Sequence, residues 1–338
     1  MRRAGNATGL LAGLVLALAW LGEVAVAQGP PAAGTATGKA KAVGGTQDGV
    51  TEREPTSTST STSTGTGVPS VTRPGESEPV VAGASVVAAA VAAGRHWRLT
   101  TGNGPVHVWV PAGYHADGAV TVVYVHGYYT DVDHAWSEYQ LPEQFALSAI
   151  NAVFIAPEAP SGSRPPINWR SLGDLLRTVH QRTEVPRPAG PVVAFGHSGA
   201  YRTLLTWLDY PLLETLVLLD AMYGEIDPFR DWLEAGPHRR LVNVGDDTVL
   251  WTEELAHDLP MLEIDRVPPD QLPAAVRGAR AVYIRSQLGH MPLVTDGLAL
   301  PQLLRALPVE LLPDAPWDQP LGVLPRGQLP GGADEQMP

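Results

Sequence analysis

Seven short apolar runs rich in valine, leucine and isoleucine recur between residues 106 and 284, and segments with helical patterning separate them. Strands that helices cover on both faces have unbroken apolar sequences rather than alternating ones. The two patterns together predict an α/β fold with a doubly wound, mostly parallel sheet. The expected strands are 106–110, 120–125, 152–156, 192–195, 215–219, 241–244 and 281–284, and the expected helices are 135–148, 172–181, 200–208, 228–234 and 252–258.

The composition changes on both sides of this body. Residues 28–95 consist mainly of Gly, Ala, Thr, Ser and Pro, which bury too little apolar surface to offset the entropy of ordering, so we expect a disordered linker there. Within it, residues 80–93 are rich in Ala and Val, and the sequence leaves open whether they form a short helix or continue the linker. The folded domain is expected at 96–308, followed by a tail rich in Pro and Gly at 309–338.

The first 27 residues have the features of an export signal. Arg2 and Arg3 precede an apolar run at 10–21, and small residues ending at Ala27 form a cleavage site. A retained membrane anchor is the alternative, but the run is shorter than the roughly 20 residues that a membrane-spanning helix needs. We therefore predict cleavage near Ala27, export to the periplasm or the medium, and no stable membrane span afterwards.

Charge and cysteine content exclude several classes of function. The formal net charge is −12, whereas nucleic acids and anionic membranes are bound by clustered basic faces. The chain has no cysteine, so disulfides and thiolate metal sites are impossible. We expect no nucleic-acid partner, and a domain of this size can be stable without covalent cross-links.

A candidate nucleophile lies between an expected strand and an expected helix. The run Gly196, His197, Ser198, Gly199 and Ala200 follows the strand at 192–195 directly. A serine on such a tight turn is held with its hydroxyl exposed at the edge of the sheet, and the turn requires small neighbours. Alanine replaces glycine in the last position of the usual motif. The alternative is a serine that only caps the following helix.

A serine hydroxyl needs a base within hydrogen-bond reach. In the fold that carries this turn, the acid and then the histidine follow the serine along the chain, which leaves His238, His257 and His290. His238 lies beside two arginines and His257 lies in a helical pattern, so both are expected on the surface. His290 follows the last expected strand, and we predict that it is the base.

Two strand ends offer the acid that orients this histidine. Asp220 ends the strand at 215–219, and Asp246 and Asp247 follow the strand at 241–244. Asp246 and Asp247 could instead cap the next helix, whereas Asp220 has no obvious helix to cap and would need a partner if buried. The sequence favours Asp220 and keeps Asp247 as the alternative.

Acyl transfer also requires backbone donors for the developing oxyanion. We expect one from Gly199, the residue after the nucleophile, and one from Tyr128 or else Gly127, where a His-Gly turn leaves the strand at 120–125. His126 is expected to brace this turn.

A metal site at His126, Asp131, Asp133 and His134 is the alternative use of this region. Their spacing matches no familiar ligand set, so we predict neither a metal nor a cofactor.

The His-Gly loop, the Gly-His-Ser-Gly-Ala turn, Asp220 and His290 together resemble the α/β-hydrolase superfamily, over about residues 96–308. The runs 123–128 and 151–157 and the turn 220–224 are similar to a poorly characterised bacterial branch of exported serine hydrolases. The resemblance implies a hydrolase that cleaves an ester or amide bond through an acyl-enzyme, in a small molecule or a polymer.

The short segment 221–240 leaves no room for a large cap domain, so we expect an open cleft. The aromatic residues Tyr129, Trp169 and Tyr223 are candidates for its walls, although each could equally be a packing residue. The functional alternative is a catalytically inactive hydrolase fold that serves as a binding or scaffold protein on a flexible tether.

Overall fold

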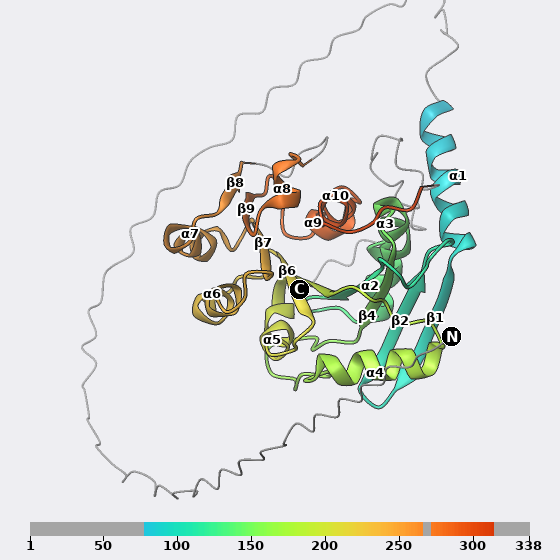
Figure 1. Cartoon of the computed structure of the whole chain (residues 1–338), viewed down its shortest axis with the longest axis horizontal. Coiled ribbons are helices and arrows are strands. Elements are labelled where there is room, and N and C mark those ends of the chain that lie inside the picture. Colours follow the sequence, from blue (N-terminus) through green and yellow to red (C-terminus); the bar gives the residue numbers. More distant parts are fainter. Residues whose placement is uncertain (1–77, 266–271, 314–338) are drawn as a thin grey trace, which may run out of the picture. The chain divides into compact units, whose positions relative to one another are not determined.

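The computed structural model describes residues 78–265 and 272–313 (Figure 1). The expected signal peptide 1–27, the larger part of the expected linker and the tail from residue 314 lie outside the described residues. Helix α1, Glu78–Ala93, covers the stretch for which the sequence left helix and linker open. Within the two described ranges, no helix combines the length and the apolar character needed to cross a membrane.

The described residues form one nine-stranded sheet in the order β1-β2-β4-β3-β5-β6-β7-β9-β8. Strand β2 pairs antiparallel with both β1 and β4, and all other neighbours are parallel. The strands are β1 (Arg95–Thr101), β2 (Gly104–Val110), β3 (Val120–Val125), β4 (Ala152–Pro157), β5 (Val192–His197), β6 (Leu213–Leu219), β7 (Arg240–Gly245), β8 (Leu262–Ile264) and β9 (Ala281–Arg285).

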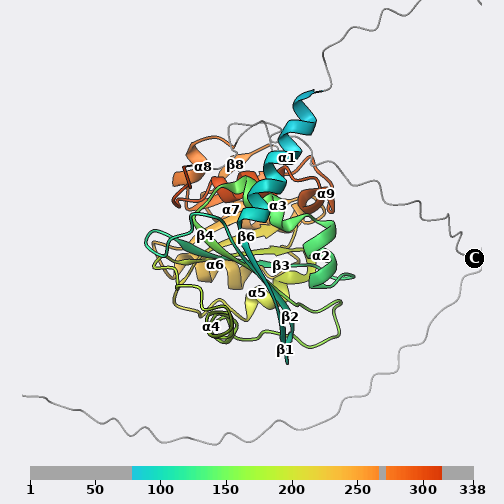
Figure 2. The same ribbon diagram turned by 90° about the vertical axis from the view of Figure 1, so that its right-hand side faces the viewer.

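Helices cover both faces of the sheet. Figures 1 and 2 show α4 and α5 on one side and α3 and α9 on the other. Besides α1, the helices are α2 (Val132–Glu138), α3 (Leu141–Ser148), α4 (Leu172–Thr183), α5 (Tyr201–Leu205), α6 (Ile226–Glu234), α7 (Val249–Asp258), α8 (Ala275–Gly278), α9 (Pro292–Thr295) and α10 (Ala299–Arg305).

Two hydrophobic cores result, one under each helical layer. Neighbouring residues of one strand point to opposite faces, so Leu218 of β6 packs in the core beside α4 to α7, whereas Val217 packs in the core beside α2, α3 and α10. Both side chains are fully buried, as is every residue of β3 and β5. This double burial explains why these strands have unbroken apolar sequences.

The helix predicted at 135–148 is in fact two helices. Helix α2 begins three residues earlier, because the Asp131 side chain accepts a hydrogen bond from His134 N at 2.8 Å and caps it. Gln140 then adopts a left-handed conformation with φ 51°, and Pro142 lies in the first turn of α3. Periodicity cannot reveal this break, since the apolar pattern continues through it.

Other elements also differ from the prediction, which did not include the helices α8, α9 and α10. Strand β1 was missed because it has the charged sequence of an exposed edge, and β8 because it has three residues. The helix expected at 200–208 is a 3-10 turn, Ser198–Ala200, followed by the shorter α5.

The predicted fold class is confirmed: this is an α/β-hydrolase fold, with a mostly parallel sheet, an antiparallel second strand and a serine turn after central strand β5. Only α6 lies between β6 and β7, so the described chain has no large cap domain there. The carboxyl ends of β3, β5, β6, β7 and β9 face the same edge of the sheet, where ligands bind in open α/β folds.

Candidate active site

Ser198 lies on a strained turn directly after β5. Its φ of 53° is left-handed, a conformation that costs a non-glycine residue about 1–3 kcal/mol and persists only where the surroundings enforce it. A Cβ on Gly196 would lie 2.5 Å from Leu204 Cδ1, so a larger residue at this position would force the Leu204 side chain to shift. Ala200, in the position of the motif's last glycine, is buried in the core beside α4 to α7.

Ser198 and His290 line one cavity of about 540 Å3 at the carboxyl edge of the sheet. Aromatic side chains form most of its wall. The lining residues are Tyr128, Tyr129, Thr130, His134, Tyr139, His197, Ser198, Gly199, Tyr201, Tyr223, His290 and Met291.

Asp220 holds the imidazole of His290 from behind. The His290 Nδ1 to Asp220 Oδ2 distance is 2.5 Å, and the Asp220 side chain is fully buried. Its Oδ1 also accepts hydrogen bonds from Asp246 N and Thr248 N, both at 2.9 Å, and from Thr248 Oγ1 at 2.8 Å. Its Oδ2 accepts one from Asp247 N at 3.2 Å. Five donors therefore fix this carboxylate in one orientation.

Asp247, the alternative acid, has a different position. Its Oδ2 lies 3.9 Å from His290 Nδ1, beyond hydrogen-bond distance, and its side chain is 68% exposed. Neither Asp246 nor Asp247 caps the following helix, since the N-cap of α7 is Thr248 and no side chain caps it. The backbone N–H groups of residues 246–248 are instead directed to Asp220.

The protonation states follow from these contacts. Burial would raise the pKa of Asp220, but hydrogen bonds from His290, from the backbone of Asp246 and Thr248 and from the Thr248 hydroxyl outweigh it, so this pKa lies well below its ordinary value. The hydrogen bond to Asp220 raises the pKa of His290 against the opposing effect of burial. The ionised carboxylate can only accept, so Nδ1 carries the proton and neutral His290 has its lone pair on Nε2.

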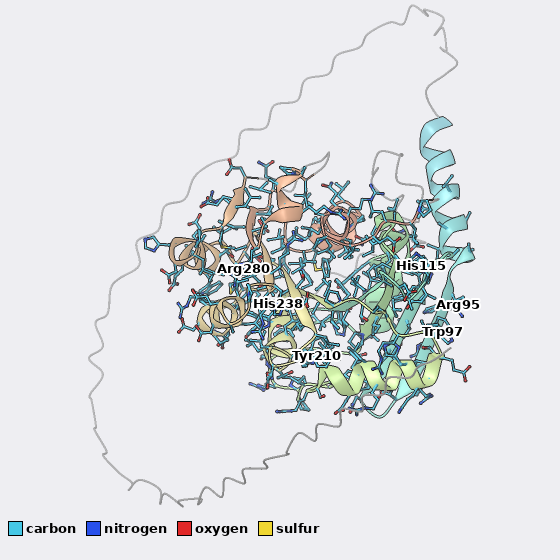
Figure 3. All side chains as sticks on the ribbon, viewed as in Figure 1. Arg95, Trp97, His115, Tyr210, His238 and Arg280 are labelled. Carbon is cyan, nitrogen blue, oxygen red and sulfur yellow. The ribbon has the colours of Figure 1, made fainter. Side chains whose placement is uncertain are left out.

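The other two histidines that follow Ser198 are on the surface, as expected. His238 is exposed at the end of the segment after α6 (Figure 3), and the His257 side chain is 90% exposed on α7. Neither lines the cavity.

The loop after β3 packs directly on the serine turn. A Cβ on Gly127 would lie 2.8 Å from Ser198 Cβ, and a Cβ on Gly199 would overlap the ring of Tyr128. Tyr129 N donates to Ser161 O at 3.0 Å and is therefore already engaged. The candidate oxyanion donors are therefore the N–H of Gly199 and that of Tyr128 or Gly127, all in segments that pack on the serine turn.

His126 braces this loop from the buried side. Its Nδ1 donates to the Gly127 carbonyl at 2.8 Å, and its Nε2 lies 3.0 Å from Glu158 Oε1. In a planar trans peptide the C=O and the N–H point in opposite directions. Because His126 holds the Gly127 carbonyl, the N–H of Tyr128 points away from His126.

The three aromatic cleft candidates divide into two groups. Tyr129 and Tyr223 line the cavity; Tyr129 is 95% exposed on a left-handed backbone with φ 62°, and Tyr223 contacts the ring of Tyr201 at 5.7 Å. Trp169 does not line it. The Trp169 indole is buried in the core beside α4. The backbone carbonyl of Trp169 accepts a hydrogen bond from Trp207 Nε1 at 2.7 Å, so Trp169 is a packing residue.

The acidic and histidine residues near the oxyanion loop do not converge on one point. Asp131 caps α2, while Asp133 forms hydrogen bonds with Arg98 and with His107 Nε2. Among the residues that the structure describes, one group of three has possible metal-ligand atoms within 4.8 Å of one another, and it consists of Asp220, Asp247 and His290. These are the groups of the acid and base pair, and Asp220 already accepts five hydrogen bonds.

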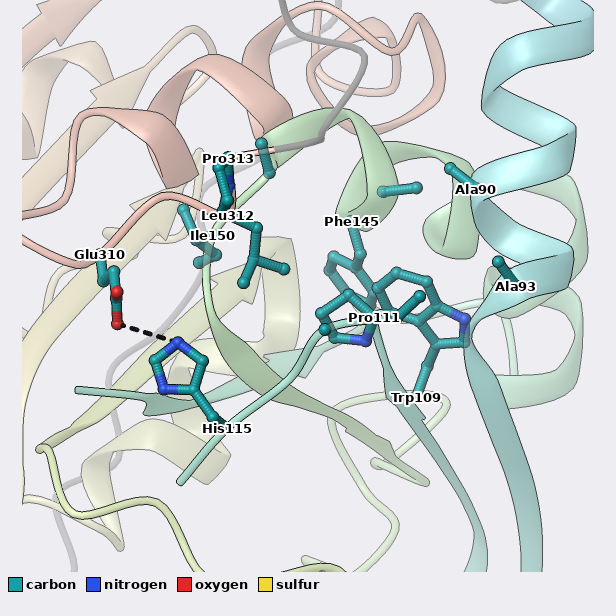
Figure 4. A pocket seen from close by; sticks show the side chains of 14 residues that line it. Ala90, Ala93, Trp109, Pro111, His115, Phe145, Ile150, Glu310, Leu312 and Pro313 are labelled. Atoms are coloured by element: carbon teal, nitrogen blue, oxygen red, sulfur yellow. Dashed lines mark ion pairs between the residues drawn. The ribbon is translucent and has the colours of Figure 1, made fainter. Parts of the chain in front are cut away.

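A second cavity, also of about 540 Å3, lies between α1, α3 and the chain after α10. Figure 4 shows the His115–Glu310 ion pair, 3.5 Å long, at one end and the rings of Trp109 and Phe145 farther along. Its lining holds no serine and no acid–histidine pair beside a nucleophile. Volume does not distinguish the two cavities, but chemistry does.

Several polar residues of the site were not predicted, and two of them bind its functional groups. Thr248 donates twice to Asp220, and nothing in its sequence context indicates this. Glu158, the partner of His126, follows β4 directly, so its position at a strand end is a signal that could have identified it.

Comparisons with known proteins add little beyond the fold. No protein-family model matches the chain, and no curated protein matches it. Similar solved structures include a feruloyl esterase module from Clostridium thermocellum, with 12% identity over 62% of this chain and 88% of that chain and a TM-score of 0.43. An esterase from Pyrobaculum calidifontis has 13% sequence identity over 67% of this chain and 91% of that chain, with a TM-score of 0.39. An S-formylglutathione hydrolase from Agrobacterium tumefaciens has 11% identity over 63% of this chain and 91% of that chain, with a TM-score of 0.38. Because these scores are low, the fold class rests on the strand order and crossovers described above.

Proposed function

We propose that this protein is a serine hydrolase that cleaves an ester or amide bond through an acyl-enzyme. The observation that carries the proposal is the hydrogen bond between Asp220 and His290 in the wall of the cavity that also contains the strained Ser198. A scaffold protein would not require a buried carboxylate with five donors behind a histidine in that cavity.

In the first half-reaction, Ser198 Oγ attacks the substrate carbonyl carbon while His290 Nε2 takes the hydroxyl proton. The carbonyl oxygen becomes an oxyanion, which the N–H groups of Tyr128 and Gly199 stabilise. Asp220 stabilises the imidazolium form of His290. When the tetrahedral intermediate collapses, His290 returns the proton to the leaving alcohol or amine, and the acyl group remains on Ser198.

In the second half-reaction, water takes the place of the alcohol or amine. His290 removes a proton from the water, the resulting hydroxyl attacks the acyl carbonyl, and the carboxylic acid leaves as the Ser198 hydroxyl is restored. The protein needs no cofactor for either step, because every proton moves through His290.

The residues that line the cavity favour a substrate with an uncharged acyl group. None of the described residues that line it is Lys, Arg, Asp or Glu, and five are tyrosines. Its volume lies within the range of about 300–1,000 Å3 that is usual for ligand sites. Tyr129 and Tyr223 would contact the substrate, which can be a small molecule or part of a polymer. A neutral acyl ester should be hydrolysed faster than the same ester with a terminal carboxylate. Equal rates would contradict the inference that the lining favours an uncharged acyl group.

Labelling with a fluorophosphonate probe tests the proposed activity. The folded wild-type protein should be labelled, and Ser198→Ala should abolish labelling and ester hydrolysis together. Ser161→Ala is the matched control, because Ser161 is an exposed serine of a neighbouring loop and contacts the site through its backbone carbonyl. Absence of labelling in folded wild-type protein would favour the inactive binding or scaffold protein instead.

We also propose that the chain is exported, on the strength of the signal features in residues 1–27. Recovered from the periplasm or medium, the mature protein should begin at Gln28. An intact amino terminus on protein retained inside the cell would contradict export.

A further inference from the structure

His197, the last residue of β5, is buried between two functional loops of the site. Its side chain is 2% exposed. Its Nε2 lies 3.0 Å from the backbone carbonyl oxygen of His290, and the two rings are 4.5 Å apart between centroids. On its other side, Nδ1 lies 3.2 Å from the position that a Cβ on Gly127 would occupy. The ring thus touches both the base loop and the oxyanion loop.

The contacts fix the hydrogen-bonding role of His197. A carbonyl oxygen can only accept, so Nε2 carries the hydrogen. Burial, followed by the charge of nearby His290, lowers the pKa of His197 to about 3. The ring is therefore neutral at any pH at which the protein would work, and its donor to His290 is permanent. With Nε2 engaged and Nδ1 buried, His197 is not available as a base for Ser198.

The base residue is held at two points. Asp220 binds its Nδ1, and His197 donates to its backbone carbonyl. The start of α9 leaves that carbonyl to His197, because the N–H groups of Leu293 and Val294 bond to Gly289 O and Met291 O. The residues on either side of His290, Gly289 and Met291, are exposed.

We propose that His197 is a positioning residue for His290: its Nε2–H fixes the main chain of the base loop so that the imidazole, held by Asp220, keeps its position in the cavity that also contains Ser198. This inference rests on the proposed hydrolase function. A single hydrogen bond at Nδ1 leaves the ring free to swing about that bond, whereas a second anchor on the backbone removes this freedom. A misplacement of about 1 Å at a reacting group can lower turnover by about 100-fold.

Three substitutions separate positioning from packing. In His197→Gln, the amide nitrogen is as many bonds from the backbone as Nε2 and can still donate to the carbonyl. The amide of His197→Asn is one bond shorter, so it has the same polarity without the reach, and His197→Met has similar bulk without a donor. All three need circular dichroism and thermal unfolding to verify folding.

We expect kcat for a small neutral ester to fall by about 100-fold in His197→Asn and His197→Met, with KM little changed, and His197→Gln to restore most of it. The pH profile should change in the same pattern. Asp220 raises the pKa of His290, so a loosened loop should move the acidic limb of kcat/KM to lower pH in the Asn variant and leave it in place in the Gln variant. Equal kcat and equal pH limbs in the Gln and Asn variants would overturn the proposal.

An NMR measurement, which does not depend on turnover, distinguishes the positioning role of His197 from the proposed hydrolase activity. The proton in the short Asp220–His290 bond should give a far-downfield NMR signal in wild type and His197→Gln, and this signal should broaden or vanish in His197→Asn. If wild type is inactive but the signal follows this pattern, the hydrolase proposal fails while His197 still positions His290. A signal of equal sharpness in all variants refutes the positioning role, whatever the activity.

Discussion

Replacing Asp220 by asparagine should nearly abolish hydrolysis while the protein stays folded. The amide oxygen of Asp220→Asn can remain where Oδ1 accepts from Asp246 N and from Thr248. The amide NH2 then occupies the position of Oδ2 and faces His290 Nδ1. Since NH2 can only donate, His290 must put its lone pair on Nδ1 and its proton on Nε2. Nε2 is the atom that has to take the proton of Ser198.

The magnitude follows from this change of tautomer. A wrong tautomer behind a catalytic serine lowers turnover by about 10⁴-fold, which corresponds to about 5.5 kcal/mol of transition-state stabilisation. The stability cost is smaller. Asp247 N, 3.2 Å from Oδ2, then faces a donor instead of an acceptor, and a buried unpaired donor costs about 1–3 kcal/mol. Activity should therefore fall far more than the free energy of unfolding.

The assay compares Asp220→Asn with Asp247→Asn. Both lose one negative charge, but the Asp247 carboxylate is 68% exposed and 3.9 Å from His290 Nδ1. We expect kcat/KM for a neutral ester to change little in Asp247→Asn, with urea unfolding measured in parallel for both variants. Loss of activity in Asp247→Asn with retention in Asp220→Asn would refute the assignment of the acid.

Three other predictions concern pH, the oxyanion loop and the exposed tyrosine. Because His290 must be neutral to act as base and Asp220 raises its pKa, kcat/KM should rise with pH through a midpoint above the ordinary value of 6.5; a midpoint below 6.5 in a pH–rate profile would contradict this. Gly199→Ala should lower kcat by about 10²–10³-fold, because the new methyl displaces the ring of Tyr128 and with it an oxyanion donor. The double variant Gly199→Ala/Tyr128→Ala should recover part of this loss, and steady-state kinetics that show no recovery would argue against the contact. Tyr129→Gly should raise the free energy of unfolding by roughly 0.5–1 kcal/mol in urea titrations. Glycine relieves the strain of the left-handed φ of 62°, this gain exceeds the cost of its extra chain entropy, and the tyrosine ring buries almost no surface. Unchanged or lower stability would show that the backbone is not strained there.

The sequence predicts the interior of the sheet well, because burial on both faces gives unbroken apolar runs. All seven expected strands exist, with ends shifted by no more than two residues. Some of the elements that it misses are those for which local pattern and tertiary role diverge. The exposed charged residues of β1 resemble a loop, and the break at Gln140 is a backbone conformation that no apolar period reports.

The site divides in the same way. Motif and chain order lead to Ser198 and His290, and the structure brings both to one cavity. The sequence favours Asp220 over Asp247 only weakly, because both follow strand ends at the same edge. The choice depends on how residues 246–248 turn their N–H groups toward Asp220, which is a three-dimensional property of the loop. His197 is similar: its neighbour Ser198 draws attention in the sequence, whereas its own partner is 93 residues away.

The two edges of the described sheet bear on how copies of this protein behave when concentrated. At one edge, β1 exposes Arg95, His96 and Arg98, and at the other, β8 has only three residues. Charged and very short edge strands disfavour the addition of a strand from another chain. Parallel sheets assemble slowly from distant segments and leave such edges exposed meanwhile. The same charged residues that make β1 hard to predict as a strand therefore protect this edge against aggregation.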